Sequence, residues 1–162
     1  ANRYFLSFVV EVKPVNIDAK NQSIGIDLGI KTFAVMSNRE KAQSPDYSKL
    51  DRKIRKLQKK LARQPKDSKR SHKTRIKIAK LHNQITDIRK DFLHKLSTKI
   101  ISKNQVIVLE DLNVSGMVKN RKLAKSISLQ GWRQFRTLCE GKAEKFNRDF
   151  RVISRWEATS QI

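Results

Sequence analysis

Two successive helical patterns constrain the fold of this chain more than any other feature. Between residues 48 and 101, apolar residues recur every three or four positions, and Pro65 interrupts the pattern because proline breaks a helix interior. Each pattern forms one narrow apolar stripe on an otherwise charged helix, and two such stripes are buried most simply against each other. We therefore expect an antiparallel helical hairpin over residues 48–101. The stripe residues are Leu50, Ile54, Leu57, Leu61, Ile78, Leu81, Ile85, Ile88, Phe92, Leu96 and Ile100.

The positive charge of the chain is concentrated on this hairpin. The net charge is +22, from 37 basic and 15 acidic residues, and fourteen basic residues but one acid lie between Arg52 and Lys80. Solvated helix surfaces usually mix both signs, whereas such an excess repels itself unless a polyanion is bound. Nucleic acid is the expected partner, and an anionic membrane surface or a merely solvated helix face is the weaker interpretation. The predicted nucleic-acid-binding residues are Arg52, Lys53, Arg55, Lys56, Lys59, Lys60, Arg63, Lys66, Lys69, Arg70, Lys73, Arg75 and Lys77.

Short apolar segments outside the hairpin predict the strands of a sheet. Residues 4–12 (YFLSFVVEV), 23–30, 32–36, 106–109 and 151–154 are rich in β-branched, aromatic or other apolar residues. Residues 128–147 repeat apolar residues at helical spacing and predict a third helix. The order of these segments predicts an α/β or α+β domain in which helices pack against a mixed sheet.

The composition excludes several other classes of protein. Cys139 is the single cysteine, so these residues form neither an internal disulfide framework nor a cysteine-rich zinc site. The sequence has no run of about 18 apolar residues, and no signal-peptide pattern opens it. We therefore expect a cytoplasmic protein without a transmembrane helix.

Asp27 is an acidic residue inside an apolar strand. Strand alternation places it on one face with Gly25 and Gly29, and places the isoleucine and leucine residues of the strand on the other face. The two glycines leave open space beside the carboxylate, where a metal ion and a phosphate could approach. The alternative interpretation is a turn or cap residue, since Gly29 could begin a β-turn.

Glu110 ends the apolar segment VIVL and is the second candidate. It shares a face with Val106 and Val108, whereas Asp111 points the other way. An ionised carboxylate near a core is costly unless it is paired or bound to metal. Glu110 is therefore either a metal ligand or a strand-end acid paired with a lysine. We expect Asp111 to cap the loop of residues 111–115 rather than to bind metal.

If both acids are functional, Asp27 and Glu110 predict a site for Mg²⁺ or Mn²⁺, because carboxylates without a cysteine or histidine cluster suit hard cations. Two such ions about 3.5–4 Å apart can activate a water and stabilise the leaving oxygen in phosphodiester cleavage. Two acids are usually too few, so a third ligand is expected from elsewhere. The three histidines show no ligand spacing. We expect Cys139 and Trp132 to be core residues.

Five segments of the chain resemble TnpB, the OrfB-type family of bacterial insertion sequences, which is described as a transposase family and is related to type V CRISPR effector nucleases. They are GIDLGIKTFAV (25–35), RKDFLHKLSTKI (89–100), VLEDLNVSGMVKN (108–120), LAKSISLQGWRQF (123–135) and WEATSQI (156–162). The resemblance covers nearly the whole chain in order, which makes it more specific than any single motif.

The resemblance implies an RNase H-like nuclease fold of the RuvC type, with residues 48–101 as an inserted helical hairpin. It implies that Asp27 is the first catalytic aspartate, on the central strand, and that Glu110 is the catalytic glutamate at the end of the fourth strand, with Mg²⁺ between them. Family members are RNA-guided: an RNA from the transposon end directs cleavage of complementary DNA. DNA and this guide RNA are thus the implied partners, in the cytoplasm of a bacterium or archaeon.

The chain departs from the family pattern at both ends. In the family, a segment like TSQI leads into a Cys-x-x-Cys zinc ribbon and the third catalytic aspartate, whereas this sequence stops at Ile162. The domains that grip the guide RNA and recognise the target-adjacent motif are also missing. We expect residues 1–15 to hold the last strand of a preceding domain and residues 16–162 to form the nuclease domain. Alone, the chain is expected to bind no zinc and to be inactive or weakly active.

Three functions remain open from the sequence. The first is the core of a metal-dependent DNA endonuclease that cleaves phosphodiester bonds. The second is a nucleic-acid-binding module that uses the basic hairpin while Asp27 and Glu110 are vestigial or structural. The third is an assembly protein whose hairpin self-associates through its leucine and isoleucine stripes.

Overall fold

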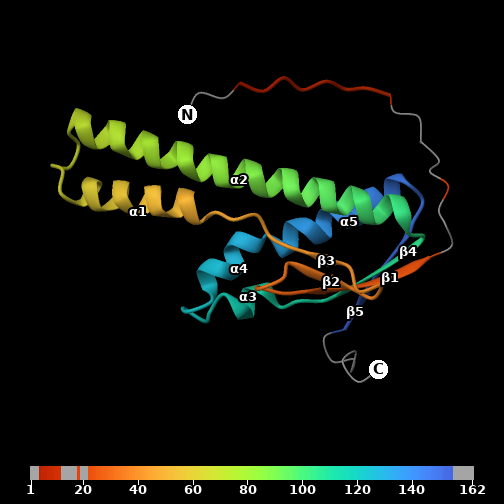
Figure 1. Ribbon diagram of the computed structural model, residues 1–162. Coiled ribbons are helices and arrows are strands. Elements are labelled where there is room, and N and C mark those ends of the chain that lie inside the picture. The colour runs from red at the N-terminus through yellow and green to blue at the C-terminus, as the bar shows by residue number, and fades with distance from the viewer. Residues whose placement is uncertain (1–3, 12–17, 19–21, 155–162) are drawn as a thin grey trace. The chain divides into compact units, whose positions relative to one another are not determined.

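Five strands form one mixed sheet in the computed structural model, which describes residues 4–11, 18 and 22–154. They are β1 (Ser23–Leu28), β2 (Ala34–Met36), β3 (Lys41–Ala42), β4 (Val106–Glu110) and β5 (Asp149–Ile153). Their order across the sheet is β3-β2-β1-β4-β5. β1 is antiparallel to β2 and parallel to β4, and β5 is parallel to β4 (Figure 1). The predicted mixed sheet is confirmed, with β1 as its central strand.

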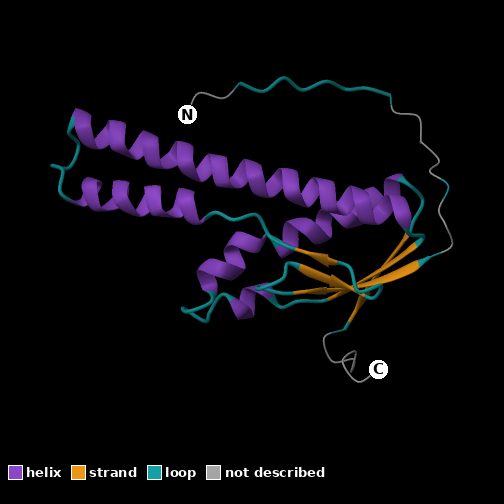
Figure 2. Ribbon diagram, in the orientation of Figure 1, coloured by secondary structure: helices purple, strands orange, loops and turns teal. Residues whose placement is uncertain are grey.

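The described residues also contain five helices, which Figure 2 draws in purple and the strands in orange. The predicted hairpin region contains α1 (Ser48–Ala62) and the long helix α2 (Lys69–Lys103). The remaining helices are α3 (Val114–Met117), α4 (Ala124–Gln130) and α5 (Trp132–Lys145). α1 ends three residues before Pro65, as the sequence predicts.

The chain divides into two compact units, and α2 belongs to both. The first is built around Pro45–Lys90, where α1 and the first part of α2 lie side by side and are joined by residues 63–68 (Figure 1). Its buried hydrophobic residues are Tyr47, Ile54 of α1 and Ile85 of α2. Ile88, predicted in the same stripe, is 36% exposed.

The second unit, Lys13–Ser44 with Asp91–Ile162, contains the sheet and the main core. Strand alternation places Ile26 and Leu109 in this core, at 4% and 1% exposure. Phe33 and Phe135 are completely buried against them. On the last part of α2 the buried residues are Leu93, Leu96, Ser97, Ile100 and Ile101. This buried face is wider than the predicted stripe because the helix belongs to the core of a sheet there, not to a two-helix seam.

The structure corrects two predictions about local structure. Residues 4–11 form no strand, and their apolar side chains are exposed, for example Phe5 at 84%. A strand needs a hydrogen-bonded neighbour, and none pairs with this segment within the described residues; Val12 and residues 156–162 lie outside that part of the chain. The helix predicted over residues 128–147 is two helices, because Gly131 adopts the left-handed conformation (φ 74°) between α4 and α5.

Candidate metal and nucleic-acid site

The predicted acids Asp27 and Glu110 lie next to each other on neighbouring strands. β1 and β4 are parallel, and Ile26 is in register with Leu109. The next residues along the two strands are Asp27 and Glu110. Neighbouring strands are about 4.8 Å apart, and residues in register point to the same face of a sheet. The structure thus brings the two predicted acids together at one edge of the sheet, on the face opposite Ile26 and Leu109.

Neither acid has a protein partner in the described part of the chain. Asp27 is exposed and Glu110 is half-buried, and no described side chain forms an ion pair or a hydrogen bond with either carboxylate. Asp27 pairs in the ladder with Val35, so it lies within a strand and not in a turn. None of the lysines in the described residues pairs with Glu110, although the chain has a net charge of +22. Two adjacent unpaired carboxylates are a suitable arrangement for binding a cation.

The space beside Asp27 differs at its two glycines. A Cβ added at Gly25 would meet only the Cβ of Ser37, at 3.8 Å, so this side is open. A Cβ added at Gly29 would lie 2.8 Å from the carbonyl oxygen of Thr32. Gly29 is therefore required by the tight loop between β1 and β2, which its amide closes by donating to the carbonyl of Phe33 at 3.1 Å.

The donor set suits a hard cation but is incomplete. Carboxylate oxygens are the ligands that Mg²⁺ and Mn²⁺ prefer. Within residues 4–11, 18 and 22–154, no group of three histidine, cysteine, aspartate or glutamate residues is placed to hold a metal ion. Asp27 and Glu110 can therefore supply two ligands, and a third has to come from outside the described residues or from water and substrate.

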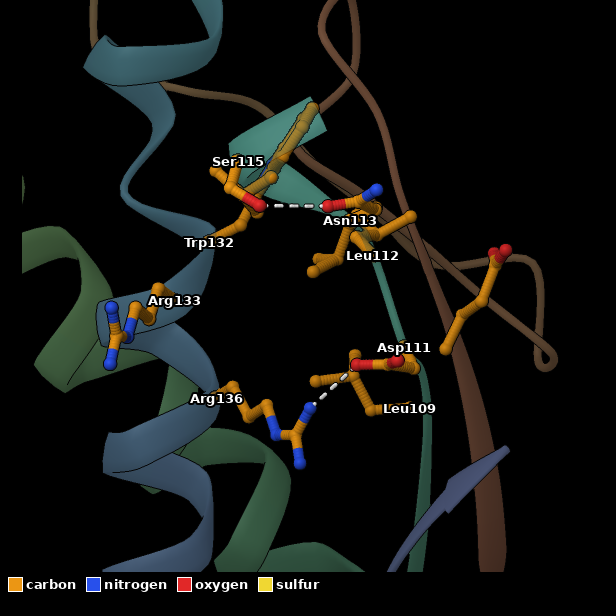
Figure 3. A pocket seen from close by; sticks show the side chains of 11 residues that line it. Leu109, Asp111, Leu112, Asn113, Ser115, Trp132, Arg133 and Arg136 are labelled. Atoms are coloured by element: carbon orange, nitrogen blue, oxygen red, sulfur yellow. Dashed lines mark hydrogen bonds and ion pairs between the residues drawn. The ribbon is translucent and has the colours of Figure 1, made fainter. Parts of the chain in front are cut away.

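Asp111 differs from its predicted role. Its carboxylate accepts a hydrogen bond from Nη1 of Arg136 at 2.9 Å (Figure 3). The N-cap of α3 is Asn113, whose Oδ1 accepts from the amide of Gly116 at 3.0 Å. The loop of residues 111–115 is thus capped by the amide side chain two residues further along, and Asp111 connects the end of β4 to α5.

A cavity of about 320 Å³ lies between the β4–α3 segment and α5. Figure 3 shows Arg136 reaching across it to Asp111, with Trp132 at its upper end. Nε of Arg136 also donates to Glu140 at 2.9 Å. Hydrogen bonding to Glu140, followed by the charges of Glu140 and Asp111, raises the pKa of Arg136. Two carboxylates therefore hold the arginine: Glu140 on α5 itself, and Asp111 just after the end of β4.

The aromatic and sulfur-containing candidates are core residues, as predicted. Trp132 is 3% exposed, and its Nε1 has no hydrogen-bond partner in the part of the chain that the structure describes. Cys139 is completely buried, and burial raises the pKa of its thiol to about 12. Neither side chain is available to stack on a base or to act as a nucleophile.

The thirteen predicted nucleic-acid-binding residues are all exposed. Six are on α1, five are on α2, and Arg63 and Lys66 lie in the turn between the helices. Arg55 pairs with Asp51, through Nε at 2.8 Å, and Arg75 lies 3.8 Å from Asp67. Within the described residues the other eleven form no ion pair or side-chain hydrogen bond with an acidic residue. Their charge is therefore available to phosphate groups.

Two polar residues that support the strand ends were not predicted from the sequence. Gln130 is 9% exposed and hydrogen-bonds to Ile30 and Ser44, and Arg136 contacts Asp111. Their partners lie 25 to 100 residues away along the chain, so no local pattern could identify them. A glutamine followed by a glycine, Gln130–Gly131, is the one weak signal that the sequence offered.

Comparisons with known proteins identify related sequences. The pattern of the OrfB_IS605 family, described as "Probable transposase", matches residues 7–121. A relative from Streptomyces pristinaespiralis, named "Putative RNA-guided DNA endonuclease", is 39% identical over all of this chain and 40% of its own length. InsQ of Escherichia coli K12, which bears the same description, is 33% identical over 70% of this chain and 32% of its own length.

These matches show how much of its relatives the chain covers and to which family it belongs. The chain spans about 40% of the length of the Streptomyces relative that it matches. Among the described helices, none is both long enough and apolar enough to cross a membrane. The family pattern covers most of the sequence, including Asp27 and Glu110. The chain belongs to the OrfB_IS605 family of probable transposases.

Proposed function

We propose that this chain is the RuvC-like core of an RNA-guided DNA endonuclease, and that its sheet is an RNase H-like sheet. The single observation that carries the proposal is the adjacent, unpaired position of Asp27 and Glu110 at one edge of the sheet. Asp27 lies in the central strand and Glu110 ends β4, as the resemblance to TnpB implies. The names of the relatives, which are described as RNA-guided DNA endonucleases, support the same reaction.

In this proposal the two carboxylates bind Mg²⁺ or Mn²⁺, and a third ligand is contributed from outside residues 22–154. When bound, the metal ions activate water and neutralise charge on the cleaved phosphodiester. Asp27 and Glu110 would hold the positive charge of the metal at the open face beside Gly25, where a DNA backbone has space to approach. Their own role is to fix the position of positive charge relative to the phosphate, which is a preorganised electrostatic contribution.

The basic surface of α1 and α2 binds nucleic acid in this proposal. Eleven exposed basic residues that form no ion pair within the described part of the chain are suited to phosphates of a guide RNA or of its duplex with DNA. Such a surface recognises the backbone and shape, while base pairing to the guide selects the sequence.

Cleavage by the full-length protein with its RNA tests the proposal. We expect Asp27→Asn and Glu110→Gln each to reduce Mg²⁺-dependent cleavage of a matched DNA by at least 100-fold, with RNA binding unchanged. Glu144→Gln, which neutralises an exposed acid on α5, is the matched control and should cleave at the normal rate. Normal cleavage by the Asp27 and Glu110 variants would refute the proposal.

A second function is favoured by the basic surface itself. If both acids prove dispensable while the full-length protein still binds RNA with a steep salt dependence, the chain is a nucleic-acid-binding module. Cleavage and RNA binding by the full-length protein separate the two functions. Neutralising Asp27 abolishes cleavage if the chain is the nuclease core, and changes neither cleavage nor RNA affinity if the chain is a binding module.

A further inference from the structure

Gln130 is a buried amide side chain that joins three segments of the sheet-containing unit. Its Nε2 donates to the carbonyl oxygen of Ile30 at 3.2 Å, and its Oε1 accepts from the hydroxyl of Ser44 at 2.6 Å. Ile30 lies three residues after Asp27, in the loop that follows β1. Buried amides are stable only when hydrogen-bonded, so Gln130 fixes this loop at a defined position.

Arg136 makes the corresponding connection at the end of β4. Its Nη1 donates to Asp111 at 2.9 Å (Figure 3), and its Nε donates to Glu140 at 2.9 Å. Asp111 directly follows Glu110, and its backbone amide donates to the carbonyl of Ile153 at 3.0 Å. The residue after Glu110 is therefore fixed by β5 on one side and by α5 on the other.

Both connections come from one corner of the fold. Gln130 ends α4, Gly131 makes the turn, and α5 begins at Trp132 and carries Arg136. Trp132 is 3% exposed and Phe135 is completely buried, so the corner is anchored in the core. Since a close-packed core has little freedom to shift, the corner holds its two polar side chains at a fixed separation.

We propose that Gln130 and Arg136 are positioning residues that set the spacing of the Asp27 and Glu110 carboxylates. Gln130 acts through the loop after β1, and Arg136 acts through Asp111 at the end of β4. This inference rests on the proposed function. Mg²⁺ demands near-ideal octahedral geometry with ligands at about 2.0–2.1 Å, so a small displacement of either carboxylate weakens its binding.

The test is the metal requirement of the full-length protein with its RNA. We expect Gln130→Leu and Arg136→Gln to raise the Mg²⁺ concentration for half-maximal cleavage at least tenfold. The more tolerant ion Mn²⁺ should restore most of the rate. Two conservative variants should show smaller increases, of about threefold. Gln130→Glu keeps the acceptor for Ser44, and Arg136→Lys keeps the positive charge. They still test the inference if Gln130→Leu or Arg136→Gln fails to fold.

A control separates positioning from plain stability. Ile101→Val shortens a completely buried side chain on α2 and should lower the melting temperature without changing the Mg²⁺ requirement. Because Arg136 acts through Asp111, Asp111→Asn combined with Arg136→Gln should raise the requirement no more than Arg136→Gln alone. A lowered melting temperature with a normal Mg²⁺ requirement in the Gln130 and Arg136 variants would overturn this inference.

The outcomes for the two proposals are distinguishable. If Asp27→Asn retains cleavage, the proposed function fails and this inference fails with it. If Asp27→Asn abolishes cleavage while Gln130→Leu and Arg136→Gln keep the normal Mg²⁺ requirement, the inference alone fails.

Discussion

The ring of Phe33 meets the ring of Phe135 edge to face, with the ring centroids 5.3 Å apart. Phe33 immediately precedes β2, at the end of the loop that follows the strand of Asp27, and Phe135 lies on α5. Phe33 makes the same kind of contact with Phe92 of α2, at 5.1 Å. One side chain therefore connects the loop after β1 to two helices, and aromatic pairs of this geometry add to the stability gained from burial alone.

Replacing Phe33 by alanine is expected to destabilise the chain by about 3–5 kcal/mol, the usual cost of truncating a buried phenylalanine. Urea unfolding followed by circular dichroism measures this change. Phe5→Ala is the matched control, because Phe5 is 84% exposed, and its free energy of unfolding should stay within about 0.5 kcal/mol of the original. Equal effects of the two substitutions would contradict the described core.

We expect RNA binding to depend less on salt when charge is removed from the basic surface of α1. Replacing Lys56, Lys59 and Lys60 by glutamine should weaken RNA binding. The slope of log affinity against log salt should fall by about 2–3, since each lost phosphate contact removes about 0.7–0.9. Fluorescence anisotropy between roughly 50 and 200 mM salt measures both quantities.

The control for this experiment removes the same charge elsewhere. Lys119, Arg121 and Lys122 are exposed basic residues after α3, outside the predicted binding residues. Their replacement by glutamine lowers the net charge equally but should leave most of the slope intact. Similar losses in the two triple variants would show that overall charge, and not the surface of α1, determines binding.

Burial of Cys139 predicts a falling stability at high pH. The pKa of its thiol is raised from 9.0 to about 12, chiefly by desolvation. Between these values the unfolded chain releases the thiol proton while the folded chain retains it, so this group destabilises the fold by about 1.4 kcal/mol per pH unit. Comparing the pH dependence of unfolding with that of Cys139→Ala isolates the thiol from lysine and tyrosine. Identical slopes above pH 9 would contradict its burial.

Replacing each of two glycines in the α4–α5 region by alanine should change the stability of the chain in opposite directions. Gly131 has a φ of 74°, where a side chain is strained, so Gly131→Ala should destabilise the chain by about 1 kcal/mol. Gly141 lies inside α5 and has no atom within 4 Å of an added Cβ, so Gly141→Ala should stabilise it by about 0.5–1 kcal/mol. Thermal unfolding of both variants tests this, and a shift in the same direction for both would count against the bend at Gly131.

Local patterns of apolar residues were sufficient to predict the central strands of the sheet. In β1, apolar residues such as Ile26 alternate with Gly25 and Asp27, and this period predicts both the strand and its buried side. β4 was predicted from four successive apolar residues, VIVL, so its alternating burial, with Leu109 in the core, is seen only in the structure. The face of Asp27 and Glu110 follows from the same alternation. Their adjacency depends on the register between strands about 80 residues apart, which alternation alone does not specify.

The incorrect predictions arose where the outcome depends on strand pairing or backbone conformation, which the local sequence pattern does not specify. Residues 4–11 have strong strand propensity, but propensity produces no strand without a neighbour to complete the hydrogen bonds. β3 is only two residues long, too short to leave a pattern. Gly131 looks like one tolerable residue in a helical repeat, and only its left-handed backbone shows that α4 ends there.

Diffraction from the full-length protein with Mn²⁺, recorded at the manganese absorption edge, would show directly whether Asp27 and Glu110 bind one metal site. We expect an anomalous peak within about 2.5 Å of carboxylate oxygens of both residues, lost in the Asp27→Asn variant. A manganese ion bound elsewhere, or these two carboxylates directed to opposite faces of the sheet, would contradict it.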